Sequence, residues 1–147
     1  MNPDHLFPVV NLIILIGWLP LFFAPRWKGT RWLMWSFAVP LILAAIYGFL
    51  IILNIKHAVG GFLSLEEVSQ ALHHRGLLLA AWIHFGVMDL FVGYWEAKDA
   101  QRSGVGRLFL LPCLVLTLFF GPAGLLAYLI VRRLFANNSP AQPKPVY

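Results

Sequence analysis

Charged residues are scarce in this 147-residue chain, at 12% of the total, whereas hydrophobic residues make up 60%. A soluble domain carries about 25% charged residues, so this chain has too few to cover a surface that faces water. The shortage excludes a water-soluble enzyme and a disordered chain. A single cysteine, Cys113, excludes an internal disulfide and a cysteine-based zinc site. The remaining class is an integral membrane protein.

Basic residues outnumber acidic ones by 11 to 6, and the formal net charge is +5. They are dispersed, because no basic run is longer than the pair Arg132 and Arg133. Such a distribution does not favour nucleic acid as a partner. In membrane proteins, basic residues in the loops face anionic lipid head groups, so we expect membrane lipid as a partner.

Long apolar runs dominate the chain, and a helix needs about 20 apolar residues to cross a bilayer. Four runs qualify and predict an all-α bundle of four transmembrane helices, at about 7–24, 32–53, 76–95 and 108–131. We expect the fourth to be kinked or split at Gly121-Pro122, because proline removes a backbone donor. Residues 1–136 are predicted to form one domain, followed by a flexible proline-rich tail at 137–147.

The connection between the second and third runs contains a helix start signal. Ser64 precedes Glu67 by three positions, as in a capping box, in which the serine accepts from the Glu67 amide and the glutamate reaches back. We therefore expect a short helix over 64–74 that lies at the membrane interface.

Two ionisable residues, His84 and Asp89, lie deep in the third run. An aspartate at the centre of a membrane helix costs about 2.5–3.5 kcal/mol, which makes such residues candidates for function. Together they are typical of acid–base catalysis; the alternative is that they only join helices through hydrogen bonds. Five helical positions turn about 140°, so we expect the two side chains to face different neighbouring helices.

Candidate substrate-binding residues surround this pair. Three share the helical stripe of Asp89 and would suit a long apolar ligand: Trp82, Phe85 and Gly93. Four polar residues are candidates by their depth in the other runs, with Tyr47 and Thr117 expected near the level of His84: Asn11, Tyr47, Asn54 and Thr117.

Neither a metal nor a cofactor is expected. The second connection holds His57, His73 and His74, but without the spacing of a helical metal site. His84 as a haem ligand would lack a second histidine at matching depth in another run. Phosphate-binding glycine loops and nucleophile-elbow motifs are also missing from the sequence.

Several segments resemble the abscisic-acid-deficient-four-like family. They are Asn11–Pro40, Gly61-Phe62 with Ser64-Leu65-Glu66, Trp82–Trp95 (WIHFGVMDLFVGYW) with Asp99-Ala100, Pro112-Cys113-Leu114, and Leu116–Tyr128 (LTLFFGPAGLLAY). Met88 departs from the pattern, which more often has an aromatic residue before the aspartate. The resemblance implies a four-span membrane protein linked to carotenoid metabolism. In plants, the family is required to form neoxanthin from violaxanthin, an isomerisation that opens an epoxide and creates an allene.

The plant members carry a plastid transit segment, whereas this chain begins almost directly at an apolar run. Beside the resemblance, this leads us to expect a bacterial protein of the inner (cytoplasmic) membrane. The first hypothesis is a membrane isomerase of an oxygenated or epoxidised isoprenoid, without redox chemistry. Asp89 would donate a proton to the oxygen, His84 would accept one from carbon or orient the acid, and Thr117 or Tyr47 would position the oxygen. The alternative is a non-catalytic carotenoid- or lipid-binding scaffold that supports a partner enzyme. Whether the chain is an enzyme, and whether it forms a homo-oligomer, stays open at this point.

Overall fold

The structure is a computed structural model that describes residues 2–23, 28–36, 38–57 and 63–138. Contacts divide the chain into two compact units, residues 1–91 and 92–147, with the boundary inside one long helix. The tail predicted at 137–147 lies mostly outside the described residues, although the last helix continues through residues 137 and 138.

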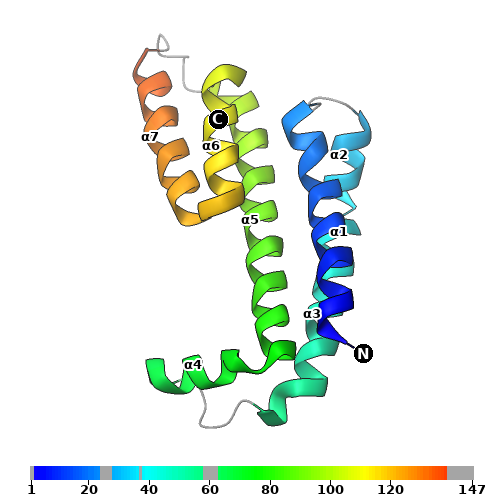
Figure 1. The fold of residues 1–147 in the computed structure, drawn as a ribbon. Helices are drawn as coiled ribbons and strands as arrows, with labels where there is room; N and C mark the ends of the chain where they lie inside the picture. The colour runs from blue at the N-terminus through cyan, green and yellow to red at the C-terminus, as the bar shows by residue number, and fades with distance from the viewer. Residues whose placement is uncertain (1, 24–27, 37, 58–62, 139–147) are drawn as a thin grey trace, which may run out of the picture. The chain divides into compact units, whose positions relative to one another are not determined.

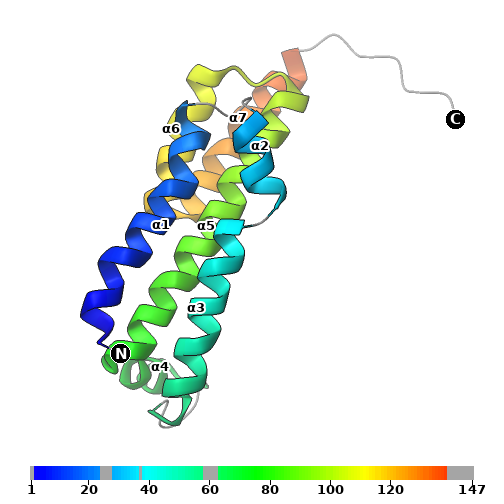
Figure 2. The same cartoon turned by 90° about the vertical axis from the view of Figure 1, so that its right-hand side faces the viewer.

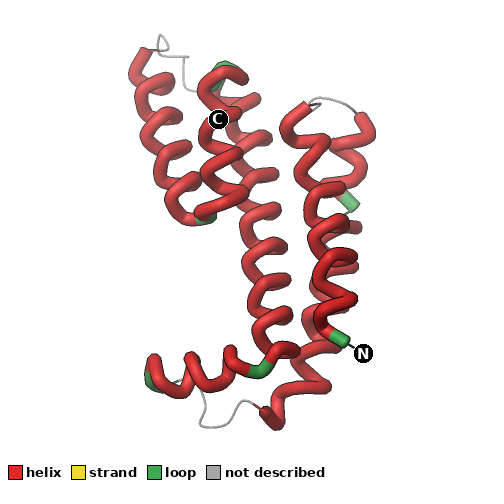
Figure 3. The backbone as a smooth tube through the Cα atoms, viewed as in Figure 1, coloured by secondary structure: helices red, strands yellow, loops and turns green. Residues whose placement is uncertain are grey.

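Every regular element in the described ranges is helical (Figure 1 and Figure 3). The elements are α1 Pro3–Phe23, α2 Lys28–Trp35, α3 Ala38–Asn54 with the 3₁₀ turn η1 Ile55–His57, α4 Leu65–His73, α5 Arg75–Ser103, α6 Arg107–Phe120 and α7 Pro122–Asn138. Three segments of the described chain are long and apolar enough to cross a membrane, namely α1, Ala38–His57 and α5. The all-α class is confirmed, while the count of four crossings stays a prediction.

The second apolar run is not one helix, which corrects the predicted span of 32–53. Helix α2 ends at Trp35 and α3 begins at Ala38. Between them, the Ser36 hydroxyl donates to the Leu33 carbonyl at 3.1 Å and accepts from the Ala38 amide at 3.4 Å. A serine that bonds to nearby backbone in this way competes with a continuous helix.

Close contacts at two glycines hold α1 in the first unit. A Cβ atom on Gly17 would lie 2.6 Å from the Leu90 Cδ2 atom of α5 and 3.2 Å from the Val39 Cγ1 atom of α3. A Cβ atom on Gly86 would lie 2.5 Å from the Ile14 Cδ1 atom. Figure 1 and Figure 2 show α1 and α3 running alongside the first half of α5. The missing side chains therefore let three helices approach closely.

Helix α4 is capped as the sequence predicts. The Ser64 hydroxyl accepts from the Glu67 amide at 3.2 Å, and the Glu67 carboxyl group accepts from the Leu63 amide at 3.0 Å. The helix lies crosswise to the start of α5 (Figure 1). Leu63 and Leu65 are 97% and 85% exposed at its beginning, whereas Ala71 near its end is buried. Exposed leucines on a crosswise helix agree with the expected interfacial position, which stays a prediction.

The second unit contains the last turns of α5 together with α6 and α7. Helix α6 ends at Phe120. It is capped by Gly121, whose φ of 38° suits a residue without a side chain, and α7 begins at Pro122. The two helices then pack side by side as a hairpin (Figure 1). A Cβ atom on Gly124 would lie 2.1 Å from the Thr117 backbone nitrogen. The predicted split at Gly121-Pro122 is confirmed.

Candidate functional site

A cavity of about 350 Å³ lies among α1, α4 and α5 in the first unit. At one end, Arg75 forms an ion pair with Asp4. Farther along α5, the Trp82 indole donates to the Asn11 side-chain oxygen at 2.8 Å, and its ring centroid lies 5.8 Å from that of Phe7. The cavity is therefore apolar along its length and carries an ion pair at its end.

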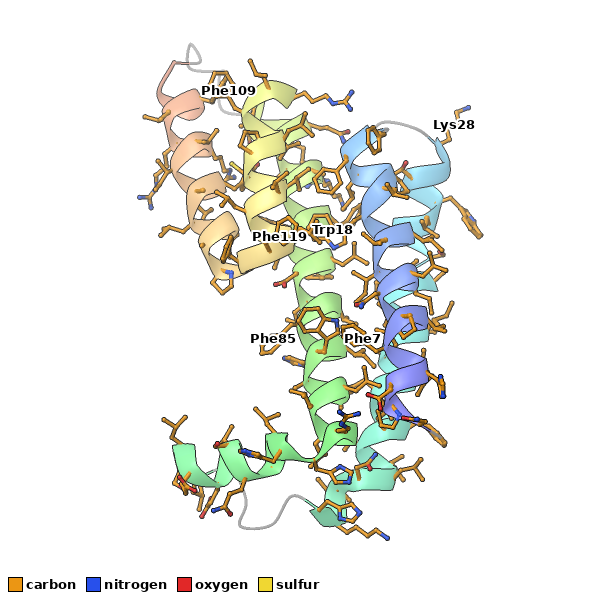
Figure 4. The ribbon with its side chains drawn as sticks, viewed as in Figure 1. Phe7, Trp18, Lys28, Phe85, Phe109 and Phe119 are labelled. Carbon is orange, nitrogen blue, oxygen red and sulfur yellow. The ribbon has the colours of Figure 1, made fainter. Side chains whose placement is uncertain are left out.

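A second cavity, of about 230 Å³, lies beside the first, between α3, α4 and α5. Its lining includes Tyr47 and His84, whose ring centroids are 6.0 Å apart. The two residues therefore lie at the same level, as their depths in the apolar runs predict. The two cavities share three lining residues, Leu72, Ala81 and Phe85. Phe85 is 61% exposed, and Figure 4 shows its ring projecting from α5. Phe85 therefore stands between the two cavities.

One face of α5 connects the ion pair of the first cavity to Asp89. Leu78, Trp82 and Phe85 line that cavity, and on a regular helix they fall with Asp89 within an arc of about 60°. Asp89 is partly buried, and no hydrogen bond or ion pair to its carboxyl group is found among the described residues. Arg75 and Asp89 are about 21 Å apart along the helix axis, at a rise of 1.5 Å per residue.

His84 and Asp89 do not share a face. Helix α5 is α-helical from Arg75 to Ser103 without a π-bulge, so the two side chains point about 140° apart. His84 lines the second cavity, while Asp89 continues the stripe that lines the first. An acid at Asp89 and a base at His84 therefore approach a ligand from different sides of Phe85.

Two predicted binding residues, Asn54 and Gly93, line neither cavity. The Asn54 amide donates to the Leu50 carbonyl at 2.7 Å, and its side chain would lie 2.6 Å from a Cβ atom on Gly76. Asn54 thus joins the end of α3 to the start of α5 and lines neither of the two cavities. Gly93 is buried in the second unit.

Thr117 also belongs to the second unit, and its partner is Glu96 rather than His84. The Thr117 hydroxyl lies 2.9 Å and 3.1 Å from the two carboxyl oxygens of Glu96. It also lies 3.0 Å from the Cys113 carbonyl oxygen. Depth in the apolar runs predicts that Thr117 lies near the level of His84, with the third run ending at Trp95. The helix instead continues to Ser103, and it buries Glu96, which becomes the partner of Thr117.

A second carboxyl group lies one turn beyond Glu96. The Tyr128 hydroxyl donates to the Asp99 carboxylate at 2.7 Å, and the Arg132 Nε atom lies 2.7 Å from the same oxygen. Glu96 and Asp99 were not among the predicted site residues. The signal that would have found Glu96 is its position two helical turns after Asp89 on the same face of α5, and Asp99 follows Glu96 by one turn. Their partners join α6 and α7 to α5.

Within the described ranges, no three histidine, cysteine or acidic side chains lie close enough to hold a metal ion. The described chain is thus an all-helical protein with long apolar helices and two adjoining apolar cavities, beside which a long helix carries a carboxyl group.

The chain matches the ABA DEFICIENT 4-like family over residues 5–128, and it belongs to that family. This confirms the resemblance found in the sequence and ties the chain to carotenoid metabolism, in a membrane setting. No curated protein and no solved structure matches the chain. A bacterial source and an inner-membrane location stay predictions.

Proposed function

We propose that this protein is a membrane isomerase that opens an epoxidised, carotenoid-like isoprenoid by acid–base chemistry. The observation that carries the proposal is the Asp89 carboxyl group, partly buried and without a hydrogen-bond partner among the described residues, on the stripe that lines the larger cavity. Ionisable groups inside membrane helices are costly, and an unpartnered one is a candidate for contact with a substrate.

The shape of the stripe supports an elongated apolar ligand. A rod-like isoprenoid placed along α5 would cover Leu78, Trp82 and Phe85, over the length of about 21 Å between Arg75 and Asp89. Polar groups at the ion-pair end would meet Arg75 and Asp4. An oxygenated end group at the other end would meet the Asp89 carboxyl group.

The proposed reaction adds one proton to the substrate and removes another proton from it, so the product has the same mass as the substrate. Asp89 in its neutral form donates its proton to the epoxide oxygen while the carbon–oxygen bond breaks, and the oxygen keeps the bonding electron pair. A neighbouring carbon loses a proton to a base, and its bonding electrons form the new double bond. This first step needs the Asp89 carboxyl group in its neutral form.

His84 is the proposed base, acting from the second cavity with Tyr47 beside it. A neutral imidazole nitrogen carries a lone pair that can accept a proton from carbon. Since the two groups face different sides of α5, the ligand's end group has to lie across Phe85, which both cavities share. We assign to Tyr47 the positioning of the epoxide oxygen, because the Thr117 hydroxyl is hydrogen-bonded to Glu96.

The test is turnover by the purified full-length protein in lipid nanodiscs with an epoxy-carotenoid. We expect a product of identical mass and changed retention time. Asp89→Asn and His84→Ala should each abolish it, whereas Glu66→Gln, the same kind of change at an exposed carboxyl group on α4, should not. Turnover that survives both cavity-side substitutions would refute the mechanism.

The second candidate is a non-catalytic scaffold that binds a carotenoid or lipid for a partner enzyme. The separation of His84 and Asp89 on two faces of α5 favours it, because binding needs no meeting of acid and base. This function predicts that pigment or lipid co-purifies with the protein and is recovered unchanged. It also predicts that Trp82→Ala lowers the amount bound while Asp89→Asn does not.

We further propose that α6 and α7 enter the membrane as a hairpin in place of the fourth crossing predicted from the sequence. At 1.5 Å per residue they are about 21 Å and 25 Å long, and the apolar core of a bilayer is about 30 Å thick. The support is their close packing around Gly124 and the turn at Gly121.

A further inference from the structure

Two histidines that are far apart in the sequence stack at the end of the first unit where the Asp4–Arg75 ion pair lies. The ring centroids of His57 and His74 are 4.3 Å apart and the ring planes differ by 7°. His57 ends η1, which follows α3. The Nδ1 atom of His74 is buried and has no hydrogen-bond partner among the described residues. The stack therefore joins the end of α3 to the connection between α4 and α5.

His74 is the single residue between α4 and α5. Its amide donates to the Ala71 carbonyl at 3.2 Å and closes α4, while its own carbonyl accepts from the Leu78 amide at 3.0 Å and opens α5. Its ψ of 117° lies outside the helical range, so the chain turns here. A change in the His74 backbone angles would therefore change the direction in which α4 leaves α5.

Helix α4 forms part of the wall of both cavities. Leu72 lines each of them, and Ala71, which lines the smaller one, is only 2% exposed. The rest of α4 has few tertiary anchors, since Leu65 is 85% exposed and the capping bonds are local. A small change in how the His74 connection is held would therefore open or close both cavities.

We infer that the His57–His74 stack is a pH-responsive latch that holds α4 over the two cavities. Histidine changes its charge between about pH 8 and pH 5. Two neutral rings stack without cost, whereas two charged rings at this distance repel each other. A charged His74 would also present a second N–H at the buried Nδ1 position, where no acceptor lies among the described residues. The latch is closed at high pH and released as the pH falls.

The surrounding charges act in the same direction. Lys56 precedes His57 in η1, His73 precedes His74 in α4, and Arg75 follows it in α5. On α1, Asp4 pairs with Arg75, and His5 is exposed next to it. Most of these neighbouring ionisable groups are basic, so they add to the repulsion that a proton on either ring of the stack meets. The inference rests on the proposed function only in taking the cavities as the ligand site.

The test is hydrogen–deuterium exchange of the full-length protein in nanodiscs without ligand, at about pH 8 and about pH 5, corrected for the intrinsic pH dependence of exchange. We expect the amides of α4 to open about fivefold more often at the lower pH, which is the factor for two unit charges about 4 Å apart in water. Amides at the centre of α5 serve as the internal reference and should not change.

The matched variants separate the latch from a general effect of pH. His57→Phe combined with His74→Phe keeps two stacked rings without charge, and α4 should then exchange equally at both pH values. His73→Gln removes a neighbouring histidine that is not in the stack and should keep the response. His57→Phe alone serves if the double variant does not fold. An unchanged α4 in the native protein, or a response that survives the loss of His57, would overturn the inference, and neither outcome depends on turnover.

Discussion

The Thr117 hydroxyl of α6 lies 2.9 Å from a carboxyl oxygen of Glu96 on α5, and both residues are fully inaccessible to solvent. A buried carboxyl group needs a hydrogen-bond partner, because water cannot replace one. Along α5, Asp99 repeats the arrangement with Tyr128 and Arg132 of α7. The α6–α7 hairpin is thus attached to α5 by polar contacts inside an otherwise apolar unit.

Replacing Thr117 with valine should destabilise the protein by about 1–3 kcal/mol, because it leaves the buried Glu96 carboxyl group without the hydroxyl. Unfolding of the purified protein in detergent, followed by circular dichroism, measures the loss. Thr117→Ser retains the hydroxyl and is the control, which should be less affected. Equal stability of the valine and serine variants would mean that the Glu96 contact contributes nothing.

Gly124→Ala should separate α6 from α7. The added Cβ atom would lie 2.1 Å from the Thr117 backbone nitrogen, and backbone cannot move aside as a flexible side chain can. Overpacking of this kind costs about 1–3 kcal/mol. Gly48→Ala is the matched control, since no heavy atom lies within 4 Å of its Cβ position. In α3 that change should be neutral or stabilising, by up to about 1 kcal/mol. The two melting temperatures are compared directly, and a Gly124→Ala protein as stable as the native one would contradict the close approach.

The pair Trp82 and Asn11 should support ligand binding through the position of the indole ring. Trp82→Phe and Asn11→Leu each remove the 2.8 Å hydrogen bond and keep an apolar side chain. Because both lose the same contact, their effects on carotenoid affinity should not add, and a coupling of about 0.5–1.5 kcal/mol is expected. Titration of the variants and of the double variant by ligand absorbance measures it. Additive effects would show that the two residues act separately.

Local signals in the sequence were the ones that predicted structure well. The Ser64–Glu67 box places α4, and the Gly121-Pro122 step places the break between α6 and α7, because each depends on residues within one turn. The break between α2 and α3 was not predicted, since it rests on a serine that apolar periodicity does not reveal. Depth along a helix paired Tyr47 with His84 correctly, but it could not find Glu96, which lies past the predicted end of the span.

The hairpin of α6 and α7 makes a prediction about membrane sidedness. Gly106 and Arg133 lie near its open end, where the rings of Phe109 and Phe135 are 5.1 Å apart, and Phe120 lies at its turn. In a Cys113→Ala background, Gly106→Cys and Arg133→Cys should be labelled by a membrane-impermeant maleimide from the same side of sealed vesicles. Phe120→Cys, at a position 66% exposed on the protein, should resist labelling from both sides because it faces lipid.

A helix that crossed the membrane once between Gly106 and Arg133 would instead place these two residues on opposite sides. The two variants would then be labelled only in vesicles of opposite orientation. Since each helix is shorter than the apolar core of about 30 Å, we expect the same-side result.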